Sequence, residues 1–214
     1  MRLRFNRWAA ATVVVAAIVL VLGGPAQAGE RTETLQSQGQ RYSLHLYHLH
    51  TGENIDVVYK VGDTYIPAAL DELNHFLRDY RTDTVKAYDP QEFDLLHSLM
   101  RKLGRPNGVI DIVCGYRTPE TNHFLRTRAA RTGVAEHSQH IQAKAIDIRV
   151  PGVSTVKLRN AALSLNEGGV GYYPSSQFVH VDVGPVRKWS YGRVRSRRVR
   201  SHAHARARMR AVGE

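Results

Sequence analysis

Two segments of this chain combine the pattern of a β-strand with side chains that bind metal ions, and any fold must place both. The first segment, residues 138–147, reads SQHIQAKAID and carries His140 and Asp147. The second, residues 178–182, reads FVHVD and carries His180. Catalytic zinc typically takes three protein ligands of these types and keeps a fourth position for water. If the three side chains converge, the chain forms the site of a zinc hydrolase.

Alternation along the second segment places its polar side chains on one face. The two valines of residues 178–182 point to one side of a strand, whereas Phe178, His180 and Asp182 point to the other. Asp182 could therefore orient the His180 imidazole from behind. It could also accept a proton from the attacking water as a general base.

The first segment also has a purely structural interpretation. Asp147 stands among apolar residues, where an unpaired carboxylate is costly. Arg149 shares its strand face and could neutralise it without any metal. His137 could replace His140 as a ligand.

Residues 1–28 have the three parts of a secretory signal peptide. Three arginines precede an uncharged apolar run at residues 8–22, and a small-x-small motif, AQA, ends at Ala28. Cleavage there would begin the mature chain at Gly29 and send it to the periplasm or the cell envelope. The alternative is a retained anchor, but the run is shorter than the about 20 residues that span a bilayer. The choice between the Sec and Tat export routes stays open.

The net charge of +11 is concentrated at the two ends of the chain. Three of these charges precede residue 29 and nine lie beyond residue 186, so residues 29–186 carry a net charge of −1. The basic tail, residues 191–214, has little apolar content, which predicts disorder. It could bind anionic lipid or a wall polymer, or be a solvated extension with no partner. Export argues against nucleic acid as the partner.

Other reactive side chains are predicted to lie outside the metal site. Cys114 is the only cysteine, so no intrachain disulfide can form. It belongs to the strand-like run 109–114, which predicts apolar packing rather than a nucleophile. His45, His48 and His50 lie on another predicted strand, and we expect them at the surface or the substrate side rather than on a metal.

The rest of the sequence predicts one α+β domain. Residues 29–40 are polar and predicted to be flexible, and residues 41–190 are long enough for one core. Strands and helices mix without a regular βαβ rhythm, which is typical of the α+β class. The predicted strands cover residues 41–50, 55–59, 109–114, 145–150, 169–173 and 177–183, and the predicted helices cover 67–80, 90–103, a segment from 119 and 155–165.

Two of these helices have recognisable starts. Asp89 is the expected N-cap of one, with Pro90 as its first residue and Glu92 completing a capping box. Thr118 is the expected N-cap of another. Arg117 therefore sits at a strand-to-helix turn, a position where functional side chains are common.

Together these motifs resemble the zinc D-Ala-D-Ala peptidase and hedgehog superfamily, and within it the murein endopeptidases of the MepK type. The resemblance covers about residues 41–190. The superfamily metal signature is matched by SxH at 138–140, AxD at 145–147 and His180, and the MepK type by LRDYR at 77–81, YRTPETN at 116–122 and FVHVDVGPVRKW at 178–189.

This resemblance implies a central, largely antiparallel sheet flanked by helices. It implies zinc bound by His140, Asp147 and His180, and stem peptides of peptidoglycan as the substrate. It also implies that Arg117 meets a substrate carboxylate or the developing oxyanion, for which a guanidinium fork is suited. The alternative for Arg117 is a surface arginine that caps a turn.

Two positions depart from the family pattern, and the one at Gln142–Ala143, where many members carry a glycine, affects loop flexibility more than chemistry. Many relatives place a catalytic glutamate where this chain has Gln177, which cannot act as a base. The expected base is Asp182, with Glu136 and His137 as alternatives.

The sequence therefore predicts a zinc-dependent murein hydrolase that cleaves peptide cross-links. Two other functions stay open. One is a zinc D,D- or L,D-carboxypeptidase that trims stem peptides, and the other is a catalytically weak, zinc-containing module that binds the wall.

Overall fold

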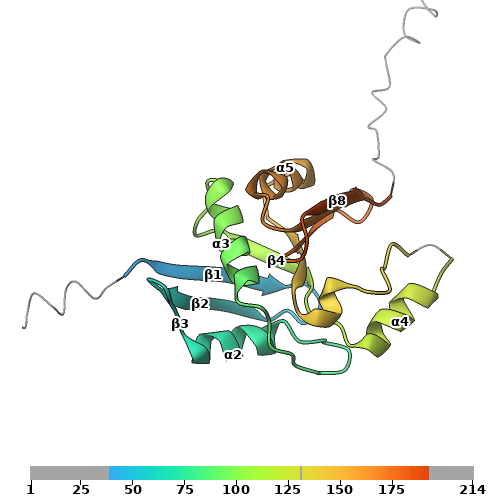
Figure 1. Cartoon of the computed structure of the whole chain (residues 1–214), viewed down its shortest axis with the longest axis horizontal. Helices are drawn as coiled ribbons and strands as arrows, with labels where there is room; N and C mark the ends of the chain where they lie inside the picture. The colour runs from blue at the N-terminus through green and yellow to red at the C-terminus, as the bar shows by residue number, and fades with distance from the viewer. Residues whose placement is uncertain (1–38, 131, 193–214) are drawn as a thin grey trace, which may run out of the picture. The chain divides into compact units, whose positions relative to one another are not determined.

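A mixed eight-stranded sheet organises the part of the chain that the computed structural model describes, residues 39–130 and 132–192. The predicted signal peptide and nearly all of the predicted tail lie outside these residues. The strand order is β3-β2-β1-β4-β5-β7-β6-β8 (Figure 1). The strands are β1 Arg41–His48, β2 Asn54–Val61, β3 Thr64–Tyr65, β4 Val109–Cys114, β5 Ala145–Arg149, β6 Gly169–Tyr173, β7 Phe178–Asp182 and β8 Arg187–Ser190.

Neighbouring strands are mostly antiparallel. Only the pairs β1–β4 and β6–β8 run parallel within the described sheet. The predicted α+β fold with a central, largely antiparallel sheet flanked by helices is therefore confirmed. No helix in the described part of the chain has the length and apolar character needed to cross a membrane.

Helices cover the sheet from one face. The helices are α2 Pro67–Phe76, α3 Gln91–Lys102, α4 Pro119–Thr127 and α5 Thr155–Leu165, with a 3-10 helix, η1, at Gln139–Gln142. Helix α2 packs on β2, α3 on β1, and α5 on β6 and β7.

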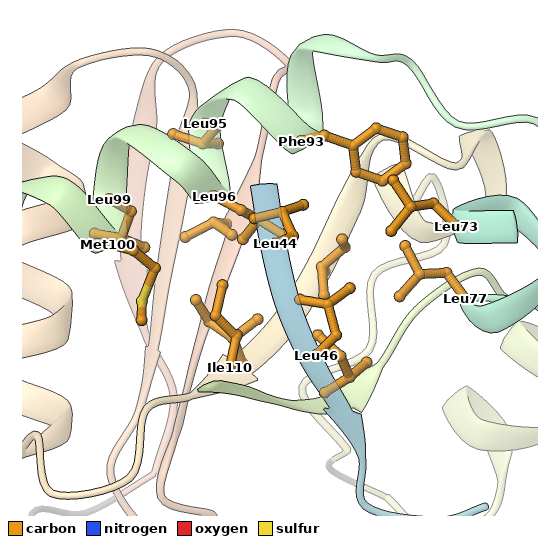
Figure 2. Close-up of a cluster of buried hydrophobic side chains, with 14 of the residues drawn as sticks. Leu44, Leu46, Leu73, Leu77, Phe93, Leu95, Leu96, Leu99, Met100 and Ile110 are labelled. Atoms are coloured by element: carbon orange, nitrogen blue, oxygen red, sulfur yellow. The ribbon is translucent and has the colours of Figure 1, made fainter. Parts of the chain in front are cut away.

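The hydrophobic core lies between these helices and the sheet. Leu44 and Leu46 of β1 point toward the helices and meet Leu96 of α3 and Leu73 of α2 (Figure 2). Burying side chains of this size contributes about 1.5–3 kcal/mol each. Because side chains alternate along a strand, the opposite face of the same strands is left for polar groups.

Helix α2 ends four residues earlier than its sequence pattern predicts. After α2 the chain is held by the fully buried carboxylate of Asp79, which accepts hydrogen bonds from two backbone N–H groups. Asp79 Oδ1 accepts from Arg81 N at 3.1 Å, and Oδ2 accepts from Thr118 N at 2.9 Å. The end of α2 is thus tied to the start of α4.

The two predicted helix starts have different outcomes. Thr118 caps α4, since its Oγ1 accepts from Thr121 N at 3.1 Å. Asp89 Oδ1 accepts from Gln91 N at 3.1 Å, but α3 begins at Gln91 with Pro90 as its N-cap, so the predicted N-cap at Asp89 and the capping box with Glu92 are wrong. Glu92 is fully buried, and neither carboxylate oxygen has a hydrogen-bond partner among the described residues. Burial, with Asp182 and Asp89 nearby, raises the pKa of Glu92 well above its ordinary value.

Candidate metal centre

Two neighbouring strands and a short helix position the candidate ligands. Asp147 of β5 and His180 of β7 are direct partners in the antiparallel register, so both side chains leave the same face of the sheet. His140 lies in η1, just before β5. Ser138 caps η1 by accepting from His140 N at 3.3 Å, and Ala143 ends it in the left-handed conformation at φ 52°.

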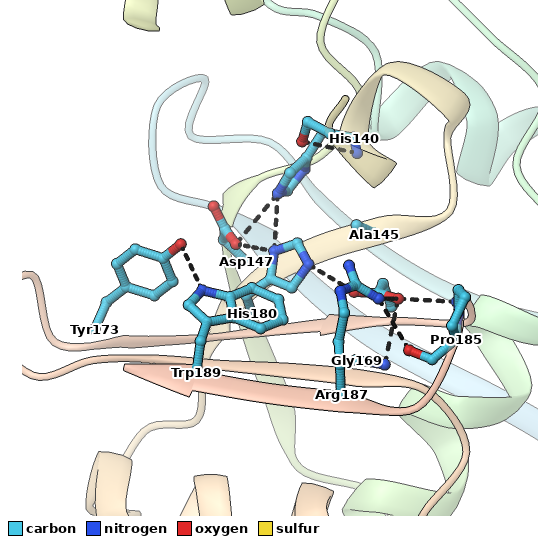
Figure 3. Close-up of polar contacts among 12 residues, drawn as sticks. His140, Ala145, Asp147, Gly169, Tyr173, His180, Pro185, Arg187 and Trp189 are labelled. Atoms are coloured by element: carbon cyan, nitrogen blue, oxygen red, sulfur yellow. Dashed lines mark hydrogen bonds and ion pairs between the residues drawn. The ribbon is translucent and has the colours of Figure 1, made fainter. Parts of the chain in front are cut away.

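The three side chains converge on one point (Figure 3). His140 Nε2 lies 3.3 Å from Asp147 Oδ1 and 3.1 Å from His180 Nδ1. His180 Nδ1 lies 2.9 Å from Asp147 Oδ1. His140, Asp147 and His180 are exposed to only 1%, 9% and 6%. The structure therefore brings together the three residues that the sequence predicts as ligands.

The hydrogen bonds of the outer ring nitrogens identify which nitrogen of each imidazole faces the site. His140 Nδ1 lies 2.8 Å from the carbonyl oxygen of Gly115, which can only accept, so Nδ1 carries the proton. His180 Nε2 lies 2.9 Å from Asp182 Oδ2 and donates to it in the same way. In the neutral rings, His140 Nε2 and His180 Nδ1 are left with free lone pairs directed at Asp147.

The surrounding charges fit a cation at this point. Burial, and then Arg117, lower the pKa of His140 to about 4, so this ring is neutral near pH 7. Burial opposes ionisation of Asp147, but His140 and His180 lower its pKa well below the ordinary value. Burial likewise opposes charge on His180, yet its hydrogen bonds with Asp147 and Asp182 raise its pKa overall.

This donor set fits zinc. Two imidazole nitrogens and one carboxylate oxygen are ligands that zinc accepts, and three protein ligands are typical of its catalytic sites. Ligand atoms held at about 2.0–2.1 Å in a tetrahedral site lie roughly 3.3 Å from one another, close to the separations of 2.9, 3.1 and 3.3 Å between these atoms. Three converging lone pairs repel one another unless a positive charge lies between them.

Cys114 lies closer to the metal centre than its apolar surroundings in the sequence predict. Its sulfur and the ligand atoms of His140 and Asp147 all lie within 4.8 Å of one another. The residue is half-buried and lines a pocket together with His140, Asp147 and His180. Burial raises the pKa of its thiol to about 12, so the sulfur is protonated in the metal-free site.

Asp182 lies on the far side of the His180 imidazole from Asp147. It is fully buried and does not line the pocket. Its two oxygens accept from the Arg187 guanidinium at 3.0 and 2.9 Å, and Oδ1 accepts from Gly184 N at 2.8 Å. Burial opposes its ionisation, but the hydrogen bonds from His180 and Arg187 lower its pKa to about 2. Asp182 could orient His180 or act as a general base, and this geometry matches the first of these roles.

Arg117 lines the same pocket, which has a volume of about 370 Å³. Its side chain is 7% exposed, and Nη2 donates to Ser138 Oγ at 3.2 Å. Its Nε is buried and has no partner among the described residues. An arginine with a spare donor, next to the ligand His140, is placed to bind an oxygen-rich group.

An aromatic wall on the other side of the pocket was missed by the sequence reasoning. The rings of Tyr173 and Phe178 stack with centroids 4.4 Å apart. Trp189 Nε1 donates to the Tyr173 hydroxyl at 3.1 Å (Figure 3). The Trp189 and His180 rings lie 5.1 Å apart. The position of Phe178 two residues before His180 was the available signal, whereas Trp189 lies on a strand that was not predicted.

Of the alternative bases, His137 and Glu136, only His137 lies in the pocket of the metal centre. His137 lines the pocket, whereas Glu136 does not line it and forms an ion pair with Arg126 at 3.6 Å. The side-chain amide of Gln177 donates to the Pro174 carbonyl oxygen in the turn before β7.

The three histidines near β1 have three different surroundings. His45 pairs with Asp56 at 2.7 Å, and His50 lines the pocket. His48 is wholly buried, which corrects the expectation that it lies at the surface or the substrate side.

Two imidazoles and one carboxylate at the base of an open pocket form the kind of centre found in metal-dependent hydrolases. Comparison with known proteins gives the family. The chain belongs to the family described as peptidoglycan L,D-endopeptidase MepK, whose model matches residues 36–189. The family predicted from the sequence motifs is thereby confirmed.

Individual relatives agree with this family. The chain is 46% identical over 146 residues to the peptidoglycan L,D-endopeptidase MepK of Escherichia coli strain K12, which covers 68% of this chain and 79% of that protein. It is 44% identical over 141 residues to the probable peptidoglycan L,D-endopeptidase MepK of Haemophilus influenzae, which covers 66% of this chain and 75% of that protein. No solved structure is a significant match.

Proposed function

We propose that this protein is a zinc-dependent peptidoglycan endopeptidase that hydrolyses an amide between an L and a D centre in peptide cross-links. The observation that carries the proposal is the pair of imidazole nitrogens, His140 Nε2 and His180 Nδ1, directed at Asp147 within 3.3 Å. The names of the relatives supply the bond type. The peptide cross-link is thus the substrate that best combines the metal centre with the family.

Each residue of the site has a separate task in this proposal. His140, Asp147 and His180 hold the zinc ion, which when bound polarises the scissile carbonyl and lowers the pKa of water. Arg117 binds a substrate carboxylate or the oxyanion that develops at the carbonyl, because its side chain lines the pocket beside His140. Asp182 is a positioning residue that keeps His180 Nδ1 turned toward the metal.

His137 is our proposed proton acceptor. Of the three bases considered from the sequence, it is the one that lines the pocket. The Asp182 carboxylate is fully buried behind His180, and Glu136 is paired with Arg126. A general base must come within reach of the water proton, directly or through one more water.

Export and the basic tail complete the proposal. We propose that the sequence before Gly29 directs export, so that the domain acts in the periplasm or cell envelope, where its substrate lies. The tail, residues 191–214, would then attach the enzyme to anionic lipid or a wall polymer. Deleting residues 193–214 should leave turnover of soluble fragments unchanged and weaken binding to anionic vesicles, and added salt should weaken the binding of the full chain.

The decisive experiment uses cross-linked muropeptide dimers with the zinc-loaded protein, before and after chelation, and resolves the products by mass. We expect zinc-dependent conversion of L,D-linked dimers to monomers. His140→Ala should abolish both turnover and zinc binding, whereas His45→Ala, at a half-buried histidine outside the pocket, should retain both.

Two other outcomes would select the alternative functions. Loss of a terminal residue alone would identify a carboxypeptidase. Gln177 favours a binding module, because its amide cannot act as a base. Stoichiometric zinc without any turnover would identify that module and refute the enzymatic proposal.

A further inference from the structure

The charges that line the metal pocket are strongly unequal. Besides the ligands and Arg117, the lining includes His50 and three more arginines, Arg81, Arg128 and Arg187, of which Arg187 is paired with Asp182. Among the described lining residues, Asp147 is the only carboxylate, and it faces the metal centre. The pocket therefore suits an anion.

Arg81 is held in place by aromatic and backbone contacts. Its guanidinium lies over the Tyr80 ring, 4.2 Å from the ring centroid, and His50 stacks on the same ring at 4.7 Å. Stacking of this kind fixes the plane of the guanidinium while leaving its N–H groups free. The side chain is thus oriented without using its hydrogen-bond donors.

One buried carboxylate sets the spacing between Arg81 and Arg117. Asp79 accepts from Arg81 N through Oδ1 at 3.1 Å and from Thr118 N, the residue after Arg117, through Oδ2 at 2.9 Å. The two arginines therefore belong to one hydrogen-bonded unit. A unit of this kind holds two cationic groups at a fixed separation before any ligand binds.

Neither Arg81 nor Arg128 is neutralised by the protein. No side chain in residues 39–130 or 132–192 forms an ion pair or hydrogen bond with either guanidinium, whereas Arg78 binds Glu53 and Arg187 binds Asp182. Their charge acts on neighbouring groups: burial lowers the pKa of His50 and Arg81 lowers it further. Arg81 and Arg128 both line the pocket.

We infer that Arg81, supported by Arg128, binds a second carboxylate of the substrate, distinct from the group that meets Arg117. This inference rests on the proposed function and names a substrate class for it. A peptide whose L centre is joined to the amine of a D centre keeps the carboxylate of that D centre unless it is blocked. The preferred substrate is therefore a peptide with a free D-centre carboxylate beside the scissile amide, rather than its amidated form.

The test compares a cross-linked peptide with its twin in which the D-centre carboxylate is an amide. Losing one charge-assisted contact at a partly exposed site costs about tenfold in affinity. We expect Arg81→Gln to raise KM about tenfold for the free acid with kcat unchanged, and to leave KM for the amide unchanged. Arg128→Gln should also raise KM for the free acid, but by less than Arg81→Gln.

Arg159→Gln is the matched control. Arg159 also lies over a tyrosine, 4.7 Å from the Tyr172 centroid, but it lines a different pocket. This variant should match the wild type on both peptides. Thermal unfolding of each variant checks the fold, and exposed substitutions of this kind usually change stability by less than about 0.5 kcal/mol.

The outcomes separate this inference from the proposed function. If the wild type cleaves neither peptide with zinc bound, the proposed function fails. If it cleaves both peptides with equal KM, or if Arg81→Gln weakens both equally, the enzyme stands and the second carboxylate site is refuted.

Discussion

The two histidines of the candidate metal centre direct different ring nitrogens at Asp147, and the partner behind each ring explains the difference. A backbone carbonyl behind His140 takes the Nδ1 proton and leaves Nε2 inward. A carboxylate behind His180 takes the Nε2 proton and leaves Nδ1 inward. The partner of His180, Asp182, is itself held by Arg187. We therefore expect metal affinity to depend on the residues behind the candidate ligands as well as on the ligands themselves.

Asp182→Asn should reveal this dependence. An amide can still accept from His180, but it removes the charge that favours the inward lone pair. We expect zinc affinity to fall about 10–100-fold, as measured by competition with a chromophoric chelator. Asp56→Asn, at the exposed Asp56–His45 pair, is the control. If Asp182 were the base instead, zinc affinity would be unchanged and only kcat would fall.

His48, which lies outside the metal centre, should make the stability of the fold depend on pH. It is wholly buried, and burial, with His50 nearby, lowers its pKa to about 4. The unfolded chain takes up a proton at His48 below pH 6.5, whereas the native state stays neutral down to about pH 4. The unfolded state thus binds more protons in this window, and stability falls as the pH falls.

Between pH 7.5 and pH 5 this histidine should cost about 2 kcal/mol of stability. His48→Asn keeps an acceptor for the backbone N–H groups of His50 and Thr51 but does not titrate. Urea unfolding in chelator should show a correspondingly smaller loss for the variant than for the wild type. An equal loss in both proteins would mean that His48 titrates normally. His45→Asn, at a half-buried histidine of the same strand, is the matched control.

At the scale of elements, β6 makes room for the aromatic wall because it carries glycine where a side chain would face the site. A Cβ on Gly171 would lie 2.5 Å from the Trp189 ring, which is shorter than real Cβ contacts. Gly169 likewise leaves space beside Asp182 and Arg187, since its Cβ would lie 2.3 Å from Asp182 Oδ2. The site thus depends on the absence of side chains on its neighbouring strand.

Gly171→Ala should displace the Trp189 indole from the Tyr173 hydroxyl. Overpacking of this kind typically costs about 1–3 kcal/mol, measurable by urea unfolding, and the tryptophan fluorescence of the native state should change. The penalty should shrink in a Trp189→Ala background, because the clashing ring is then absent. An undiminished penalty would assign the cost to the strand backbone instead.

The elements that the sequence failed to predict share a physical cause. The alternation of apolar and polar residues in β7 correctly predicts which of its faces packs in the core and which faces the metal centre. This prediction succeeds because both faces of this central strand are occupied by tertiary contacts. β8 has four residues and no alternating burial, so its place beside β6 depends on contacts distant in sequence. η1 is a single short turn held by the Ser138 cap and the left-handed Ala143. Trp189 and the exact approach of His140 could not be predicted for this reason.

The whole domain divides its sheet between two tasks. The helix-covered face carries the hydrophobic core, and the opposite face of β5 and β7 carries the metal centre. The ligands come from η1, β5 and β7, so a bound ion would join three elements that are otherwise linked by backbone pairing and packing. A site of this kind exists only in the folded chain, and metal binding is therefore coupled to global stability.

Zinc should raise the melting temperature of the whole domain through this coupling. At free zinc about 1,000-fold above Kd, binding to the native state alone adds about 4 kcal/mol, or roughly 10 °C for a chain of this size. Differential scanning calorimetry with and without chelator measures the shift. His180→Ala should abolish it, whereas His137→Ala should retain it, because His137 is proposed to act on the substrate rather than on the metal. Retention of the full shift in His180→Ala would place the stabilising metal at another site, and its loss in His137→Ala would make His137 a ligand.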